Sequence, residues 1–126
     1  MILLDSSAFY WLLTEPARIG KNATAAITST PNVFVSSITV LELTIKQMLA
    51  KLPPQDFLTG IKDSKLKALE FDLSAAASIT KFPELVGHDP FDRALLSQAL
   101  VGNLNFYTSD RKLLGLAKPW IKDIGD

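Results

Sequence analysis

Short apolar runs alternate along this chain with longer segments whose apolar residues recur every three or four positions. Buried strands are predicted at residues 2–4, 33–35 and 104–108, and further strands at 65–71 and 120–124. Helical segments are predicted at residues 7–13, 16–28, 37–52, a short stretch ending near 61, 73–82, 90–102 and 111–116. Strands that alternate with helices predict an α/β fold with a mostly parallel central sheet of four to five strands, flanked by helices.

Residues that cap helices support these boundaries. Ser6 is a plausible N-cap of the first helix, and Ser36 or Ser37 can cap the long helix that follows the second strand. Asp89 precedes Pro90, which stands at the first helical position, where proline is best tolerated. We found no internal repeat or linker, so residues 1–126 are predicted to form one domain.

Composition narrows the possible chemistry. The 13 basic and 13 acidic residues balance, so the whole molecule does not attract nucleic acid strongly, and a local basic rim or a metal would have to hold such a ligand. The chain has no cysteine and a single histidine, His88, which excludes disulfides, thiolate sites and zinc sites with several histidines. No signal peptide and no membrane-spanning stretch is apparent, so we expect a cytoplasmic protein.

Acidic residues follow the predicted strands. Asp5 comes directly after the first strand, Glu42 lies on the helix after the second, and Asp110 follows the strand at 104–108. Asp92 opens the apolar helix that precedes that strand. Because the carboxyl ends of parallel strands share one edge of the sheet, these carboxylates are expected to gather there. Hard divalent cations such as Mg²⁺ or Mn²⁺ prefer such oxygen ligands, so the pattern indicates a metal-dependent site and metal-assisted hydrolysis.

Each acid also has a structural explanation. Asp5 can cap a helix, although Ser6 could do so equally well, and Asp110 can cap the turn that follows it. Glu42 can form a capping box with Thr39 if its helix starts late, or an ion pair with Lys46 one turn further on. These alternatives stay open for each residue taken alone.

Two aspartates share the start of one helix. Asp89 and Asp92 can both stabilise the helix dipole. Asp92 heads a stripe formed by Leu95, Leu96 and Ala99, which directs it toward the core-facing side of the helix. We therefore expect Asp89 to be the cap and Asp92 to be the ligand.

Four sequence blocks, in order, resemble PIN-domain ribonucleases, and specifically the VapC-type toxins of bacterial and archaeal toxin–antitoxin pairs. The blocks are residues 2–8 (ILLDSSA), 35–43 (VSSITVLEL), 89–99 (DPFDRALLSQA) and 107–110 (YTSD). The resemblance covers nearly the whole chain, and the third block is the most specific. It implies a PIN-like fold.

The resemblance also implies a set of site residues. Asp5, Glu42, Asp92 and Asp110 match the family's metal-binding catalytic carboxylates, with Mg²⁺ or Mn²⁺ as cofactor. Supporting roles are implied for Ser6, the hydroxyl that helps to order the site, and for Thr108. Asp110 stands at the family's least constant position, and Asp89 is an alternative ligand.

One position departs from the family pattern. The family often carries a histidine two residues before this Asp-Pro-Phe-Asp-Arg run, where this chain has Gly87. His88 stands one residue further on, so we assign it no catalytic role and expect a surface or capping histidine.

The implied activity is endonucleolytic hydrolysis of RNA by a metal-activated water. Lys46, Arg93, Arg111 and Lys112 lie close in sequence to the acids and are candidates for phosphate contacts, although each could equally be solvated surface charge.

The resemblance implies two protein partners, a second copy of the chain in a homodimer and a cognate VapB-type antitoxin. The first helix carries five consecutive large apolar residues, which one helix cannot bury against a single core. Tyr10 and Trp11 are therefore candidates for the antitoxin interface, the alternative being that they pack beneath the long helices.

Two other classes of protein are alternatives to the nuclease hypothesis. A Mg²⁺-dependent phosphatase or a receiver domain also gathers aspartates at strand ends, but a haloacid-type phosphatase requires Asp-x-Asp where this chain has Asp5-Ser6-Ser7. A non-catalytic PIN-like binding module would use the acids only as caps. Metal binding separates this last alternative from the enzymes.

Overall fold

A computed structural model describes residues 1–126 and contains one sheet of five parallel strands. The strands are β1 (Ile2–Leu4), β2 (Val33–Ser36), β3 (Lys67–Leu69), β4 (Asn105–Thr108) and β5 (Ile121–Asp123). Their order is β3-β2-β1-β4-β5, and every neighbouring pair is parallel. The predicted α/β class and parallel sheet are confirmed.

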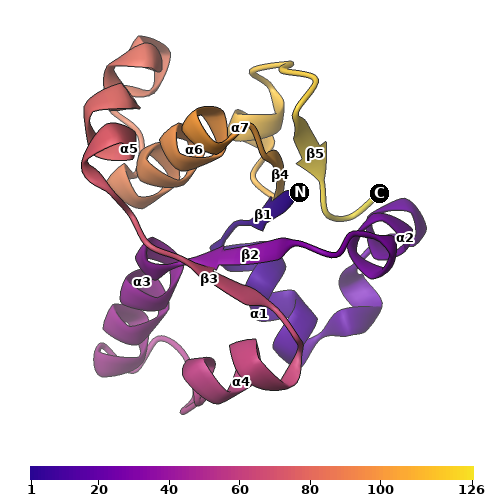
Figure 1. Cartoon of the computed structure of the whole chain (residues 1–126). Helices are drawn as coiled ribbons and strands as arrows, with labels where there is room; N and C mark the ends of the chain where they lie inside the picture. The colour runs from indigo at the N-terminus through magenta and orange to yellow at the C-terminus, as the bar shows by residue number, and fades with distance from the viewer.

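Helices cover both faces of the sheet (Figure 1). They are α1 (Ser6–Thr14), α2 (Lys21–Ser29), α3 (Ser37–Met48), α4 (Phe57–Asp63), α5 (Leu73–Ala77), α6 (Pro90–Gly102) and α7 (Arg111–Leu114). In Figure 1, α5, α6 and α7 lie above β2, α1 and α4 lie below it, and α2 lies to the right of it. Short 3₁₀ helices occupy Pro16–Arg18, Ser78–Lys81 and Pro83–Leu85.

The central strand β1 divides the core into two layers. Ile2 and Leu4 pack with α1, α2 and α4, whereas Leu3 packs on the opposite face with α6 and α7. All three side chains are buried, because successive residues of a strand point to opposite faces and both faces are covered by helices. This arrangement explains why the first strand has a continuous apolar run.

Three predicted helices have different limits in the structure. The helix expected at residues 16–28 is a 3₁₀ turn followed by α2, and they separate at Gly20, whose N–H donates to the Ile124 carbonyl. The long helix ends at Met48 rather than at residue 52, since Ala50 adopts a left-handed conformation. The helix expected at 73–82 becomes 3₁₀ after Ala77. β-Branched Ile79 and Thr80, which disfavour an α-helix, lie in that second part.

The strand order creates a crevice at the carboxyl edge of the sheet. From β1 the chain moves to β2 and β3 on one side, and later to β4 and β5 on the other. The point at which the direction reverses lies between β1 and β4, and in open α/β sheets this is where ligands bind. Asp5 leaves β1 and Asp110 follows β4 at this point.

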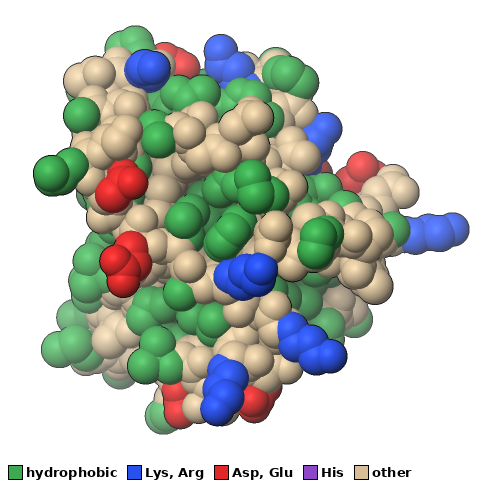
Figure 2. Space-filling view, in the orientation of Figure 1, with side chains coloured by type: hydrophobic (Ala, Val, Ile, Leu, Met, Phe, Trp, Pro, Cys, Tyr) green, Lys and Arg blue, Asp and Glu red, His purple; other side chains and the backbone are tan.

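The surface charge agrees with the balanced composition. Figure 2 shows Lys and Arg side chains spread over several parts of one face, among apolar and acidic side chains, without a continuous basic stripe. None of the helices has the length and apolar character required to cross a membrane. The cytoplasmic location stays a prediction.

Candidate active site

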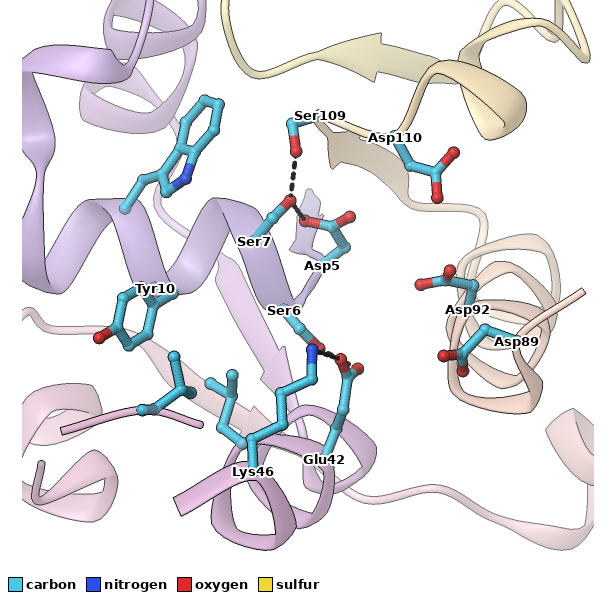
Figure 3. Close-up of a pocket in the computed structure, with 13 residues that line it drawn as sticks. Asp5, Ser6, Ser7, Tyr10, Glu42, Lys46, Asp89, Asp92, Ser109 and Asp110 are labelled. Atoms are coloured by element: carbon cyan, nitrogen blue, oxygen red, sulfur yellow. Dashed lines mark hydrogen bonds and ion pairs between the residues drawn. The ribbon is translucent and has the colours of Figure 1, made fainter. Parts of the chain in front are cut away.

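A pocket at the carboxyl edge of the sheet brings together the predicted acids (Figure 3). Its wall contains five carboxylates from separate parts of the chain, those of Asp5, Glu42, Asp89, Asp92 and Asp110. The other residues that line it are Ser6, Ser7, Tyr10, Trp11, Leu43, Lys46, Leu52 and Ser109. Independent helix caps have no reason to converge, so this convergence favours a shared role for the acids.

Asp5 is both a helix cap and a pocket residue. Its Oδ1 accepts hydrogen bonds from the Ala8 backbone N–H and the Ser7 hydroxyl, both at 2.8 Å, and thereby caps α1. The prediction of Ser6 as the cap is wrong, because Ser6 is already the first helical residue. The Thr108 hydroxyl donates to Oδ2 of Asp5. These bonds orient a carboxylate that is only 3% exposed.

Glu42 is held between two partners. The Ser6 hydroxyl donates to its Oε1 at 2.7 Å, and the Lys46 ammonium pairs with its Oε2 at 2.8 Å. The ion pair that the sequence allowed is present. The capping box with Thr39 does not form, because α3 begins at Ser37 with Ser36 as its N-cap. The implied supporting role of Ser6 therefore has a physical basis, since its hydroxyl orients the buried carboxylate.

Of the remaining three acids, Asp89 and Asp110 are helix caps and Asp92 is not. Asp89 caps α6 through a hydrogen bond from the Phe91 N–H, as expected. Asp92 lies in the first turn of α6 and accepts no hydrogen bond from the backbone. Asp110 caps α7 through its Oδ1, which accepts from the N–H groups of Lys112 and Leu113. In Figure 3 the carboxylates of Asp92 and Asp110 point toward one another across the pocket.

His88 was missed by the sequence reasoning. Its side chain is 13% exposed, and its Nε2 lies 3.1 Å from Asp92 Oδ2 and 3.5 Å from Asp110 Oδ2. The expectation of a surface or capping histidine is wrong, because Asp89 is the cap and the imidazole reaches two site carboxylates. The position four residues before Asp92 was a usable signal, since side chains at this spacing can meet on a helix.

Two serines were also missed. The Ser109 hydroxyl donates to the Ser7 hydroxyl at 2.8 Å, and Ser7 in turn donates to Asp5 (Figure 3). This chain of hydrogen bonds connects the end of β4 with the start of α1. Small hydroxyl residues beside both acids in the sequence were the available signal.

Burial, and then repulsion between carboxylates, raises the pKa of two of the site acids. Burial raises the pKa of Asp5 to about 6, although hydrogen bonds from Thr108, Ala8 and Ser7 oppose the rise. The pKa of Asp92 rises to about 7, first because of burial and then because of the negative charges of Asp5 and Asp89. The hydrogen bond to Glu42 raises the pKa of the Lys46 ammonium. A site with these shifts favours a cation, which would relieve the repulsion.

The donor set fits Mg²⁺ or Mn²⁺. Carboxylate oxygens are the ligands that these ions prefer, and the site offers no thiolate. Asp92 has no hydrogen bond to its Oδ1, which leaves this oxygen free to coordinate. His88, Asp92 and Asp110 place ligand atoms within 4.8 Å of one another, close enough to surround one ion.

Only one of the four candidate phosphate-binding residues lines the pocket. Lys46 lines the pocket. Arg93 extends to the Val86 carbonyl, and Arg111 pairs with Asp123 at 3.1 Å. Lys112 is exposed. Lys46 is thus the one basic side chain that lines the pocket, and its ammonium group is paired with Glu42.

Tyr10 and Trp11 are half-buried and line the pocket beside the acids. Both also pack against the core, and the Arg18 guanidinium lies 3.9 Å from the centre of the Trp11 ring. Neither is a large exposed apolar side chain. Four of the nine such side chains lie on and just after α3, at Leu41, Ile45, Met48 and Leu49.

The family profile of the PIN domain matches residues 2–119. The chain belongs to the PIN-domain family. The match covers strands β1 to β4 and all five acids of the pocket. It favours the PIN fold over the phosphatase and receiver alternatives.

Individual relatives agree with this membership. The chain is 27% identical over 116 residues to Ribonuclease VapC22 of Mycobacterium tuberculosis, covering 89% of this chain and 88% of that protein. Among solved structures, VapBC2 from Rickettsia felis bound to a promoter DNA fragment superposes with a TM-score of 0.69 at 17% identity, covering 98% of this chain and 97% of the other. DNA-bound VapBC from Salmonella typhimurium has a TM-score of 0.65 at 23% identity, with the same coverage. These structures support the fold.

Proposed function

We propose that this PIN-domain protein is a metal-dependent endoribonuclease that hydrolyses phosphodiester bonds of RNA, and that it acts as the toxin of a toxin–antitoxin pair. The observation that carries the proposal is the convergence of Asp5, Glu42, Asp92 and Asp110 on one pocket at the switch point of the sheet. The similarity to a protein named as a VapC ribonuclease supports the choice of RNA as the substrate.

The carboxylates would hold a divalent cation, Mg²⁺ or Mn²⁺. Such an ion, when bound, lowers the pKa of a water ligand and neutralises charge on the phosphate. The protein contributes the positions of the ligands: Thr108 and Ser7 orient Asp5, and Ser6 orients Glu42. Lys46 is near enough to the acids to contact a phosphate if its pairing with Glu42 is exchanged. No side chain is needed as a nucleophile.

The proposal is tested by incubating a mixed RNA pool with purified protein, with and without Mn²⁺ or Mg²⁺. Asp92→Asn should lose the metal-dependent cleavage. Asp63→Asn is a matched control, because Asp63 is an exposed aspartate at the end of α4, outside the pocket. Cleavage that persists in Asp92→Asn, or that does not require metal, would contradict the proposed site.

We also propose a VapB-type antitoxin as partner. The solved relatives include complexes described as VapBC, which supports a partner of this type. The half-buried Tyr10 and Trp11 beside the acidic pocket suit a partner segment that carries apolar side chains and one basic residue. Trp11→Glu should weaken binding of the co-expressed antitoxin at least tenfold in a pull-down titration. Unchanged binding together with a lower melting temperature would show that Trp11 serves only the core.

A homodimer is proposed as the state of the toxin itself. The exposed apolar residues on and after α3, Leu41, Ile45, Met48 and Leu49, form a surface of the kind that protein interfaces use. Size-exclusion chromatography with light scattering should give twice the mass of 13.8 kDa, and Met48→Glu should reduce it to the mass of one chain. A wild-type protein that elutes as a monomer would refute the homodimer.

A further inference from the structure

The imidazole of His88 is placed to bind the same cation as the acids. It belongs to the segment between the 3₁₀ helix Pro83–Leu85 and α6, and its backbone N–H donates to the Leu85 carbonyl at 2.8 Å. This bond and the start of α6 at Pro90 fix the backbone on both sides of His88. The ring itself is only 13% exposed and faces the carboxylates of Asp92 and Asp110.

The distances around Nε2 suit a shared ion. In an octahedral site with bonds of about 2.1 Å, adjacent ligand atoms lie about 3 Å apart and opposite ones about 4.2 Å apart. His88 Nε2 lies 3.1 Å from Asp92 Oδ2 and 3.5 Å from Asp110 Oδ2, and all three atoms lie within 4.8 Å of one another. Small side-chain rotations would therefore place the three atoms around a single ion.

The Nδ1 atom of the ring can carry the proton, which leaves the lone pair of Nε2 available to a metal ion. Nε2 binds a metal only in the tautomer that carries its proton on Nδ1. His88 also lines a second surface depression, together with Glu84, Gly87 and Lys112. Water in this depression can accept the hydrogen bond from Nδ1, as the outer partners of metal-bound histidines commonly do.

From this geometry, and resting on the metal-dependent function proposed above, we propose that His88 Nε2 is a direct ligand of the divalent cation, beside Asp92 and Asp110. The consequence is a mixed nitrogen and oxygen site. Mg²⁺ favours sites made only of oxygen, whereas imidazole favours transition metals. The site therefore selects Mn²⁺ over Mg²⁺ more strongly than the carboxylates alone would.

The inference can be tested directly because His88 is the only histidine of the chain. Protein without a histidine tag is loaded with Mn²⁺, and electron spin echo modulation is recorded for nitrogen coupled to the ion. The expected result is a ¹⁴N coupling of a coordinated imidazole that changes to the ¹⁵N pattern when histidine is labelled with ¹⁵N. Isotope labelling needs no substitution, so the test does not depend on whether a variant folds.

A binding titration supplies the second measurement. His88→Gln should weaken Mn²⁺ binding at least tenfold and Mg²⁺ binding by no more than about threefold, with an unchanged circular dichroism spectrum. Bound Mn²⁺ without imidazole coupling in the wild type would overturn the role of His88 and leave the carboxylate site standing. Absence of Mn²⁺ binding in the wild type would overturn the metal site of the proposed function, and His88 as a ligand with it.

Discussion

Replacing Asp92 with asparagine should stabilise the protein when no metal is present. Asparagine keeps the shape of the side chain and can hydrogen-bond to His88 in either tautomer, but it removes a negative charge that is disfavoured by burial and repelled by Asp5 and Asp89. The Asp92 pKa rises from 3.8 to about 7, mainly through burial. One pKa unit corresponds to about 1.4 kcal/mol, so this rise sets an upper limit of about 4 kcal/mol on the stability that the charge removes.

Solvent reduces this value. The Asp92 side chain is 21% exposed, so water screens part of the repulsion, and we expect a gain of about 2 kcal/mol. For a domain of this size the melting temperature should rise by about 6–8 °C at pH 8 in the presence of a chelator. Differential scanning calorimetry of wild type, Asp92→Asn and the exposed control Asp63→Asn measures the change.

The raised pKa of Asp92 determines how the stability of the wild type changes with pH. Because the pKa of Asp92 is higher in the folded than in the unfolded chain, the native state binds the proton more readily. The wild-type penalty is therefore full above about pH 7 and fades as the pH falls toward 4. The advantage of Asp92→Asn should shrink over the same range.

When Mn²⁺ is present, the wild type should be more stable than Asp92→Asn. Mn²⁺ stabilises the folded wild type by an amount that grows with the logarithm of the ratio of free Mn²⁺ to its Kd, and Asp92→Asn should lose most of that gain. An Asp92→Asn protein that melts at or below the wild-type temperature at pH 8 without metal would refute the electrostatic argument. A gain that is equal at pH 8 and pH 4.5 would refute it as well.

Other contacts lead to further expectations. Thr108→Val removes the hydrogen bond to Asp5, so it should lower the free energy of unfolding in urea by about 1–3 kcal/mol and weaken Mn²⁺ binding about tenfold. Thr108→Ser keeps the hydroxyl and should retain the stability and the Mn²⁺ affinity. Equal behaviour of the two variants would contradict the role of the hydroxyl. Phe106→Ala empties a fully buried position of β4 and should cost about 3–5 kcal/mol in the same assay; a loss below 1 kcal/mol would mean that the core is packed differently. Gly20→Ala places a Cβ against the backbone of Asp126 and should cost about 1–3 kcal/mol, which an unchanged urea midpoint would disprove.

Local features of this protein were readable from the sequence because their causes are local. The continuous apolar run at residues 2–4 predicts a strand covered on both faces, and β1 is such a strand. Pro90 after Asp89 predicts the start of a helix, and α6 begins there. The helix ends were predicted less well. Gly20 separates two helices through contacts with the distant residues Ile124 and Asp126, which no local pattern contains.

The acids themselves could be found in the sequence, whereas their surroundings could not. Strand ends predict where Asp5 and Asp110 lie, because parallel strands end at one edge. The hydrogen bond from Thr108 to Asp5 spans 103 positions, and the bond from Ser6 to Glu42 spans 36. Such partners depend on which strands become neighbours, so the burial and the pKa shifts that follow from them also depend on the strand order.

His88 illustrates the same division. Its identity and its place before α6 are properties of the sequence, and so is the fact that it is the only histidine. Its contact with Asp110 requires that α6 and the end of β4 pack side by side, and only the tertiary structure places them so. The sequence by itself determined the elements and the acidic residues of this protein. The packing of β1 between β2 and β4 decided which of those residues share a pocket, because distances between segments are set by the whole core.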